Sequence, residues 1–330
     1  MFDSSAQAEN RALVIISYYD RRPLNCLVDL LKSLAKYKAG QDFEVIVVVN
    51  QTQEALPKLP PMPFPLEVMA RENTGMNIGA WEAGWRARPG RSVYVFMQDE
   101  CLVMRDNWLT AYAERCAESG VGLVGESLNA AWGRPWAQLR VLHAGSRMPD
   151  HLIDGNPADR VEVYLECMRC WGVDPGVTAT HLRSLIWATT YATLSKIGGF
   201  PIGANYGECI ASEIAVSRKI EMAGLRVVQV RQAPFYFTIH REWNQDTPGG
   251  QYLNGKSTGK AASWDLPDRK RLDQEAERLL SLVASDVGGE ADYVLTVSAL
   301  IGKLMDRDAQ ISQLREALVQ ADTRDKVKRA

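Results

Sequence analysis

The sequence lacks an apolar run near the roughly 20 residues that a membrane-spanning helix needs, since the candidate YVLTVSALIG at 293–302 is far shorter. It also lacks an excess of charge of one sign. The 38 Lys and Arg face 40 Asp and Glu, and this balance argues against nucleic acid as a partner. No signal-peptide pattern opens the chain, because MFDSSAQAENRA is polar and acidic. These absences predict a cytoplasmic protein with at most a peripheral contact with the cytoplasmic face of a membrane.

Cysteine is scarce and scattered. Among the six cysteines, Cys167 and Cys170 form the one close pair, with no second pair at zinc-ribbon spacing and no βαβ redox context. We therefore favour packed free thiols for this pair, with a zinc or redox role as the alternative.

Apolar strands alternate with amphipathic helices over the first 127 residues, which predicts an α/β fold with a mostly parallel sheet covered on both faces. Asp106 is expected to cap the last of these helices. The expected strands are 12–19, 43–49, 66–70, 92–97 and 121–125. The expected helices are 23–37, 78–87 and 107–118.

The second half of the chain is less regular. Residues 128–180 show little periodicity and many Gly, Pro, Trp and His residues, so we expect a long irregular connection there. After it we expect helices near 188–200 and 209–223 and strands near 225–230 and 235–239. The rest reads as helical, and its short near-heptad spacing suits either a packing helix or a homodimerisation arm. We divide the chain into residues 1–127, residues 128–263 and a C-terminal helical extension, 264–330.

Polar residues directly follow three of the expected parallel strands, where ligands bind in sheets of this kind. The fourth strand runs straight into Asp99 and Glu100. Adjacent carboxylates raise one another's pKa, and a divalent cation removes that cost. Oxygen ligands suit Mg²⁺ or Mn²⁺, which commonly share carboxylates with substrate phosphates. The sequence therefore predicts a divalent metal and a diphosphate at this pair.

Four segments, in this order, resemble the large inverting glycosyltransferase family of the GT-A fold, which includes many bacterial polysaccharide and lipopolysaccharide transferases. They are LVIISYYDR, EVIVVVNQT, ENTGMNIGAWEAG and YVFMQDECLVMRDNWL. The resemblance covers residues 12 to about 240. It implies a nucleoside-diphosphate-sugar donor, a donor-binding half at 1–127 and an acceptor-binding and catalytic half at 128–263. The donor contacts it implies are Ser17, Tyr19, Asp20, Asn50, Asn73, Asn77, Gly79, Gln98 and Asp99.

A fifth segment, SEIAVSRKIEMAGLRVV, resembles the part of that family that carries the catalytic base. Its alignment on Ala223-Gly224 implies that Glu213 takes the proton of the acceptor hydroxyl. His240 resembles a late histidine of the family and would join Asp99 and Glu100 at the metal. The alternatives are a surface carboxylate for Glu213 and a strand-end histidine without a ligand for His240.

The chain departs from the family pattern at three positions. Gln98 stands where the metal motif's first Asp is usual, so Asp99 and Glu100 are left to meet metal and ribose. Asn50 stands where an Asp often contacts uracil, which leaves the donor base open. Ser212 replaces the Glu that usually precedes the base.

A competing motif, GQYLNGKS at 250–257, satisfies the phosphate-loop pattern. That pattern needs a core strand directly before it, but nine residues separate it from the strand ending at His240. We therefore favour a lid, the loop 241–262, in which Arg241 or Lys256 offsets diphosphate charge over bound donor. An ATPase or kinase role is the alternative.

Tryptophans in and just after the irregular connection suggest an acceptor platform, because sugar rings stack on aromatic side chains. Most tryptophans are nevertheless packing residues, so we expect one platform among four. The four are Trp132, Trp136, Trp171 and Trp187.

The sequence thus favours a metal-dependent transferase that moves a sugar to a glycan or lipid-linked acceptor with inversion, in polysaccharide or cell-envelope synthesis. One alternative is a sugar-1-phosphate nucleotidyltransferase, which would need a Gly-rich loop after the first strand, where SYYDRRPLN has no glycine. The other is a non-catalytic glycan-binding or scaffold protein on the same fold.

Overall fold

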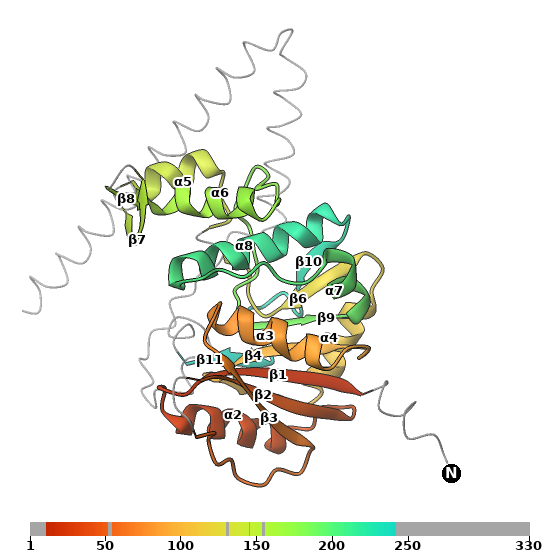
Figure 1. Cartoon of the computed structure of the whole chain (residues 1–330). Coiled ribbons are helices and arrows are strands. Elements are labelled where there is room, and N and C mark those ends of the chain that lie inside the picture. The colour runs from red at the N-terminus through yellow and green to blue at the C-terminus, as the bar shows by residue number, and fades with distance from the viewer. Residues whose placement is uncertain (1–10, 52–54, 130–131, 145, 154–155, 242–330) are drawn as a thin grey trace, which may run out of the picture. The chain divides into compact units, whose positions relative to one another are not determined.

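The computed structural model describes residues 11–51, 55–129, 132–144, 146–153 and 156–241. These residues build a mixed α/β fold around a seven-stranded, mostly parallel sheet of order β10-β6-β9-β4-β1-β2-β3, shown in Figure 1. Only β9 runs antiparallel to its neighbours in this sheet. The strands are β1 (Ala12–Tyr19), β2 (Phe43–Gln51), β3 (Leu66–Glu72), β4 (Tyr94–Gln98), β6 (Val121–Gly125), β9 (Ile186–Thr189) and β10 (Arg226–Gln229).

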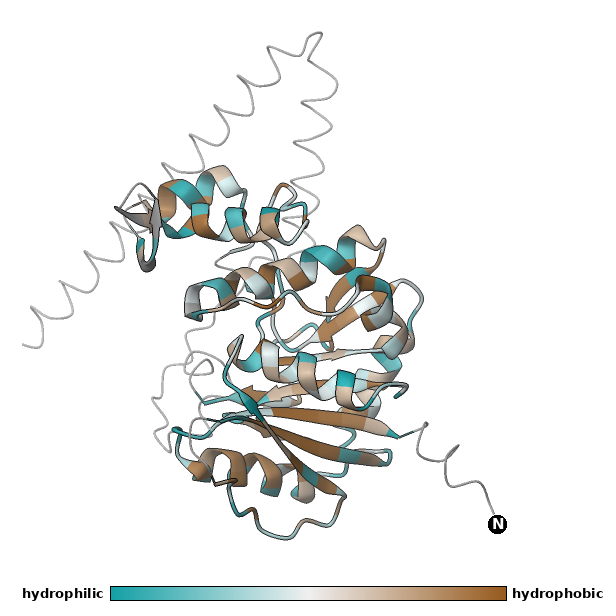
Figure 2. Ribbon diagram, in the orientation of Figure 1, coloured by the Kyte–Doolittle hydropathy of each residue, from teal (hydrophilic) through white to brown (hydrophobic). Residues whose placement is uncertain are grey.

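Two apolar layers enclose the sheet, as its continuous apolar strands predict. In β1, Val14 and Ile16 pack on one face while Leu13 and Ile15 pack on the other. Helices α2 (Leu24–Lys36) and α4 (Trp108–Ala117) cover the first face. Helices α3 (Met76–Ala87), α7 (Tyr191–Ile197) and α8 (Tyr206–Met222) cover the second. Figure 2 shows the central strands brown, the colour of hydrophobic residues.

The expectation of an irregular connection at 128–180 is wrong. This stretch holds α5 (Trp136–Leu142), the hairpin of β7 (Arg147–Ile153) and β8 (Asn156–Asp159), and α6 (Arg160–Cys170). Its apolar side chains form a separate core with one face of α8. Most of these elements are short, and the apolar residues of α6 alternate with charged ones, so the sequence shows little hydrophobic periodicity here. The elements are stabilised mainly by packing against α8.

Two local expectations also need correction. Asp106 does not cap α4: the N-cap is Asn107 at φ 59°, and Asp106 instead accepts the backbone N–H of Lys38 at 2.8 Å. The start of the helix expected near 188–200 is strand β9, and α7 begins only after Thr190, whose hydroxyl caps it. The expected strand at 235–239 is β11 (Thr238–His240), which pairs with β5 (Cys101–Val103) outside the main sheet.

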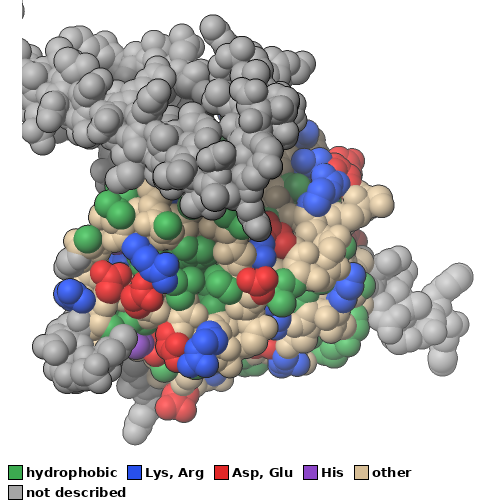
Figure 3. Space-filling model, turned by 90° about the horizontal axis from the view of Figure 1, so that it is seen from above, with side chains coloured by type: hydrophobic (Ala, Val, Ile, Leu, Met, Phe, Trp, Pro, Cys, Tyr) green, Lys and Arg blue, Asp and Glu red, His purple; other side chains and the backbone are tan. Residues whose placement is uncertain are grey.

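Charge is mixed on the surface. Arg and Glu side chains pair on several helices, including Arg86 with Glu82 and Arg218 with Glu221. On the visible part of the face in Figure 3, basic and acidic groups lie next to one another around apolar surface. Among the described residues, no helix has both the length and the apolar character that crossing a membrane requires.

A buried carboxylate fixes the segment that leads into β11. Glu126 accepts the backbone N–H groups of Tyr236, Phe237 and Thr238 at 2.7, 3.0 and 2.8 Å, and the Tyr112 hydroxyl at 2.8 Å. Burial raises the pKa of Glu126 to about 7, although these hydrogen bonds oppose the shift. Since four donors converge on two oxygens, this site requires an acceptor-only group.

We therefore expect Glu126→Gln to lower the free energy of unfolding by about 1–3 kcal/mol at pH 5.5, because the amide NH₂ would face the Tyr236 N–H and leave it unsatisfied. The loss should be smaller at pH 8, above the raised pKa of Glu126, since the buried wild-type carboxylate is then ionised at a cost that the amide avoids. Chemical denaturation at both pH values measures the change. Glu118→Gln, at an exposed carboxylate that ion-pairs with Arg115, is the control and should leave stability nearly unchanged. Equal effects in the two variants would contradict the anchoring role of Glu126.

Candidate functional site

The polar residues that follow the parallel strands meet at one edge of the sheet. In the strand register, Tyr19 lies opposite Asn50 and Ser17 lies opposite Gln98. The backbone N–H of Asp99 continues this pairing, donating to the Ser17 carbonyl at 3.2 Å. Ser17, Asn50 and Asp99 are all buried polar residues. The carboxyl ends of β1, β2 and β4 therefore form one polar cluster, in the crevice where parallel sheets bind ligands.

The acidic pair lies in that cluster. Asp99 is 4% exposed, and its Oδ2 is buried without a hydrogen-bond partner among the described residues. Arg22 forms an ion pair with Glu100 and lies 3.8 Å from Asp99 Oδ1. Burial raises the pKa of Asp99 to about 7, while Arg22 lowers it and Glu100 raises it. Asp99 thus has an oxygen available to a cation, and a cation would offset the free-energy cost of ionising this buried carboxylate.

His240 reaches the same cluster from β11. The register of β11 with β5 places His240 opposite Cys101, next to the acidic pair. Its Nε2 lies 3.2 Å from Gln98 Oε1 and 3.6 Å from Glu100 Oε2. Burial lowers the pKa of His240 to about 4, so the imidazole is neutral at pH 7. Against these two oxygens Nε2 carries the proton, and it would offer a lone pair to an ion in the other tautomer.

Asp99, Glu100 and His240 offer ligand types that suit a divalent metal, but their ligand atoms do not all lie within 4.8 Å of one another, so binding an ion would require side-chain movement. The buried, unpartnered Oδ2 of Asp99, the Glu100 carboxylate and the neutral His240 ring supply two oxygen donors and one nitrogen donor. Such a mixed set suits Mn²⁺ as well as Mg²⁺. Arg22 forms an ion pair with Glu100, so an ion bound here would share the Glu100 carboxylate with Arg22.

The turn between β3 and α3 is held by amide side chains. Asn50 donates to the Met76 carbonyl at 2.9 Å and accepts from Arg71 at 2.7 Å. Gly75 adopts φ 73° at the start of α3, and a Cβ at Gly79 would collide with the carbonyl oxygen of Thr74. The two glycines therefore permit a tight turn that non-glycine residues would distort.

Within that turn, Asn73 is exposed and Asn77 is half-buried. At the end of β1, Tyr19 and Asp20 are both half-buried. Each of these four expected donor contacts therefore keeps some exposed surface.

Ser184 links this strand-end cluster to Glu213, the expected base. Its carbonyl accepts from Asn77 at 2.9 Å and from Gln98 at 2.7 Å. Its hydroxyl donates to Glu213 Oε1 from the other side. One residue thus joins the β4 strand end, the α3 turn and helix α8.

Glu213 projects from α8 with 20% of its side chain exposed. Its second oxygen, Oε2, lies 3.5 Å from Nε2 of His181, which is fully buried. His181 in turn has its Nδ1 2.7 Å from the Ala179 carbonyl and its Nε2 3.2 Å from Asn129. The carboxylate is therefore held on both oxygens yet reachable from solvent.

The four tryptophans differ in their surroundings. Trp187 lies in the central core with no exposed surface, its ring near Trp81 and Phe200, so it offers no face to an acceptor. Trp132 stacks on His143 at 4.6 Å between ring centroids. Trp136 is buried and donates to the Pro175 carbonyl at 3.1 Å. Trp171 is half-buried at the end of α6 and keeps the most accessible ring of the four.

Arg241, the first residue of the expected lid, is the last residue that the structure describes. It forms an ion pair with Asp29, and its backbone N–H donates to the Glu100 carbonyl at 3.2 Å. The chain therefore leaves β11 directly beside the acidic pair. Lys256, the rest of the loop 241–262, the phosphate-loop motif and the 264–330 extension lie outside the described residues.

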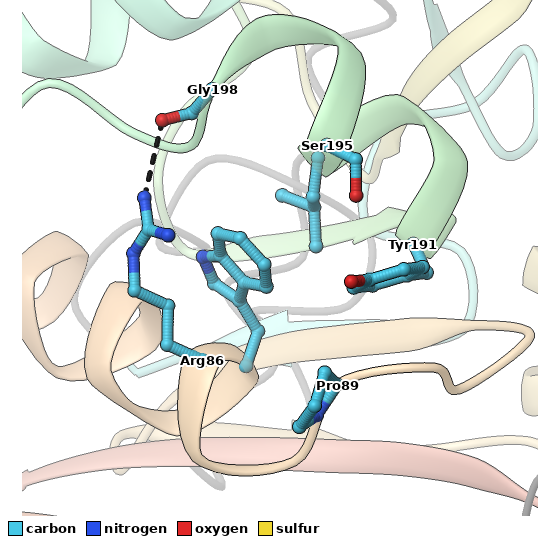
Figure 4. Close-up of a pocket in the computed structure, with 7 residues that line it drawn as sticks. Arg86, Pro89, Tyr191, Ser195 and Gly198 are labelled. Atoms are coloured by element: carbon cyan, nitrogen blue, oxygen red, sulfur yellow. Dashed lines mark hydrogen bonds between the residues drawn. The ribbon is translucent and has the colours of Figure 1, made fainter.

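The cavity drawn in Figure 4 is separate from this cluster. It has a volume of about 320 Å³ and lies between the C-terminal end of α3 and helix α7, with Trp85, Arg86 and Tyr191 in its wall. The strand-end cluster adjoins the opposite, N-terminal turn of α3. None of the residues expected at the site lines this cavity.

Three site residues escaped the sequence analysis. Arg22 directly follows the first strand end, a place where its charge could have been noted. Ser184 and His181 carry no local signal, because their contacts join segments far apart in the chain.

No family model matches the chain, and no curated protein matches it. Among solved structures, it is similar to the mannosyltransferase PcManGT from Pyrobaculum calidifontis in complex with GDP-Man and Mn²⁺, with a TM-score of 0.41 and 17% identity. The similarity covers 66% of this chain and 54% of that one, so the chain spans about half the length of the mannosyltransferase.

Proposed function

We propose that this protein is an inverting glycosyltransferase of the GT-A fold that moves a sugar from a nucleoside-diphosphate-sugar to a glycan or lipid-linked acceptor. The bridge made by Ser184 carries the proposal, because it joins the strand-end cluster to Glu213 through direct hydrogen bonds. A donor site and a reachable carboxylate base, fixed relative to one another, are what a direct displacement needs. The motif resemblance and the mostly parallel sheet support the same function.

The donor side is assigned to the strand ends. Asp99, Glu100 and His240 would hold Mn²⁺ or Mg²⁺, which when bound offsets the charge of the diphosphate leaving group. The turn held by Asn50 and Asn77 faces the same edge and would contact the nucleotide. Arg22 supplies a further positive charge beside the pair.

The acceptor side is assigned to Glu213. As the acceptor oxygen bonds to the anomeric carbon, its proton passes to Glu213 and the bond to the donor diphosphate breaks with its electron pair leaving on the diphosphate. Attack opposite to the leaving group inverts the anomeric centre. Ser184 and His181 position the carboxylate. Trp171 is the tryptophan whose exposure best suits the acceptor.

Nucleotide-sugars should raise the melting temperature of the full-length protein in the presence of Mn²⁺, because a ligand that binds only the folded state stabilises it. At 100 times its Kd a donor contributes about 2.7 kcal/mol. Thermal shifts with UDP-, GDP-, dTDP- and CMP-sugars would identify the base, and donor hydrolysis with Mn²⁺ would then test for chemistry. A chain that binds a nucleotide but cleaves no nucleotide-sugar, with or without acceptor, is a binding protein. A chain that none of these sugars stabilises has no donor site at the strand ends.

We also propose cell-envelope or polysaccharide synthesis as the setting, a cytoplasmic location and homodimer contacts through the 264–330 extension. The division into a donor half at 1–127 and an acceptor half at 128–263 agrees with the assignment of Glu213 and Trp171 to the second half. Size-exclusion chromatography with light scattering of the full chain and of a 1–263 form would test the dimer.

A further inference from the structure

Three metal-ligating side chains from different elements meet outside the strand-end cluster. A ring nitrogen of His151 in β7, the sulfur of Cys167 in α6 and a carboxylate oxygen of Glu208 in α8 all lie within 4.8 Å of one another. Each side chain is partly buried. The cluster lies where the β7–β8 hairpin and helix α6 meet the first turn of α8.

His151 has coordinating capacity that the protein does not use. Its Nε2 lies 2.8 Å from Glu208 Oε1, while its Nδ1 is buried without a hydrogen-bond partner among the described residues. Glu208 is itself fixed, since its Oε2 accepts the backbone N–H of Ala204 at 2.7 Å and its own N–H is capped by Asn205. Two of the three ligands are therefore positioned in advance by bonds to the protein.

Cys167 is distinguished from its neighbour Cys170 by this setting. Cys170 is exposed and lies against Glu166, outside the cluster. Cys167 is half-buried, and its sulfur lies within 4.8 Å of the His151 nitrogen and a Glu208 oxygen. Coordination would release the thiol proton to solvent and place a cation between two anionic ligands.

We propose that His151, Cys167 and Glu208 bind a zinc ion that ties the β7–β8 hairpin to helices α6 and α8. Imidazole and thiolate are ligands that Zn²⁺ takes and that Mg²⁺ and Mn²⁺ take poorly. Ligand atoms around tetrahedral zinc lie roughly 3–4 Å apart, so the observed spread within 4.8 Å needs only small side-chain movements. Water completes the fourth position. The site is independent of the proposed transferase activity.

The ion would stabilise the β7–β8 hairpin and α6, which lie outside the main sheet. The hairpin contacts α6 but belongs to neither face of the main sheet, and α6 packs on α8 through the separate core. Glu213, the proposed base, is five residues after Glu208 on the same helix. Zinc would therefore stiffen the acceptor side of the molecule without contacting the reacting groups.

The test uses full-length protein stripped with a chelator, reloaded with one or more equivalents of Zn²⁺ and passed through a desalting column before elemental analysis. The wild-type chain should retain one zinc, and Co²⁺ should give a thiolate charge-transfer absorption. Cys167→Ser should lose that absorption and weaken zinc binding by on the order of 100-fold or more, because loss of a direct ligand exceeds the typical loss of a supporting one. His151→Gln should weaken zinc binding in the same way.

Cys170→Ser is the matched control, since it makes the same change three residues further along α6 and should keep both the zinc and the absorption. Asp99→Asn should also keep them, which separates this site from the strand-end cluster. Zinc should raise the melting temperature of wild type and Cys170→Ser but not of Cys167→Ser. Full zinc retention and an unchanged cobalt absorption in Cys167→Ser would overturn the proposal, as would a wild-type chain that retains no zinc.

Discussion

Glu213→Gln is expected to lower the turnover number of sugar transfer by about 10²–10⁴-fold, the range that a general base contributes, while donor affinity changes by no more than a few fold. Gln keeps an oxygen to accept from the Ser184 hydroxyl, so the bridge to Asn77 and Gln98 stays in place. The amide cannot take the acceptor's proton. Steady-state kinetics gives the turnover number, and titration with the donor nucleotide gives the affinity.

The matched control is Glu221→Gln on the same helix. Glu221 forms an ion pair with Arg218 on the surface, and its exchange should leave both quantities within about twofold of wild type. Glu213→Ala should lose turnover as Glu213→Gln does. If donor binding falls with turnover in both Glu213 variants, Glu213 belongs to the metal site and the base must be sought elsewhere. Unchanged turnover in either variant would contradict a base role outright.

The central sheet could be predicted because its strands carry their own signal. The run at 12–19 is apolar at almost every position, as a strand buried on both faces must be, and it became β1 with the expected bounds. Leucines at helical spacing likewise predicted α2, whose Leu27, Leu30 and Leu34 lie in the core.

The missed elements depend on contacts distant in the sequence. Strand β9 has only four residues, and pairing with β4 on one side and β6 on the other defines it. Hairpin β7–β8 and helices α5 and α6 are similarly short, and their apolar side chains find a core only against α8. The hydrophobic periodicity of the sequence is weakest in elements that are stabilised mainly by contacts with other elements.

The same distinction separates the site residues. Parallel strands bring their carboxyl ends to one edge, so the proximity of Ser17, Asn50 and Gln98 followed from the strand order alone. The hydrogen bond from Asn77 to Ser184 joins residues 107 positions apart, and no sequence motif predicted this contact. The expected proximity of Glu213 to the donor side rested on the family resemblance, and its link through Ser184 emerged only in three dimensions.

Asp99→Asn should have the second large effect, a fall of more than about 100-fold in Mn²⁺-dependent donor affinity. Asp99 contributes the buried Oδ2 that has no hydrogen-bond partner among the described residues, and an amide removes both its charge and most of its affinity for a hard cation. Donor titrations with and without Mn²⁺ measure the effect. Asp106→Asn is the control, because it keeps the oxygen that accepts from Lys38 and lies outside the cluster. Equal donor affinity in Asp99→Asn and wild type would remove Asp99 from the metal site.

The same substitution should stabilise the metal-free protein, and the gain should depend on pH. Folding raises the pKa of Asp99 from 3.8 to about 7, so between these values the folded state binds more protons than the unfolded state and wild-type stability falls as pH rises. Asn does not titrate. The stability of Asp99→Asn relative to wild type should therefore rise by about 3–4 kcal/mol between pH 4 and pH 8, while imperfect pairing of the buried amide lowers it equally at both pH values. Denaturation in chelator-containing buffer at pH 4 and pH 8 measures it. A pH-independent difference would mean that Asp99 is ionised at little cost, and the pair would then have less need of a cation.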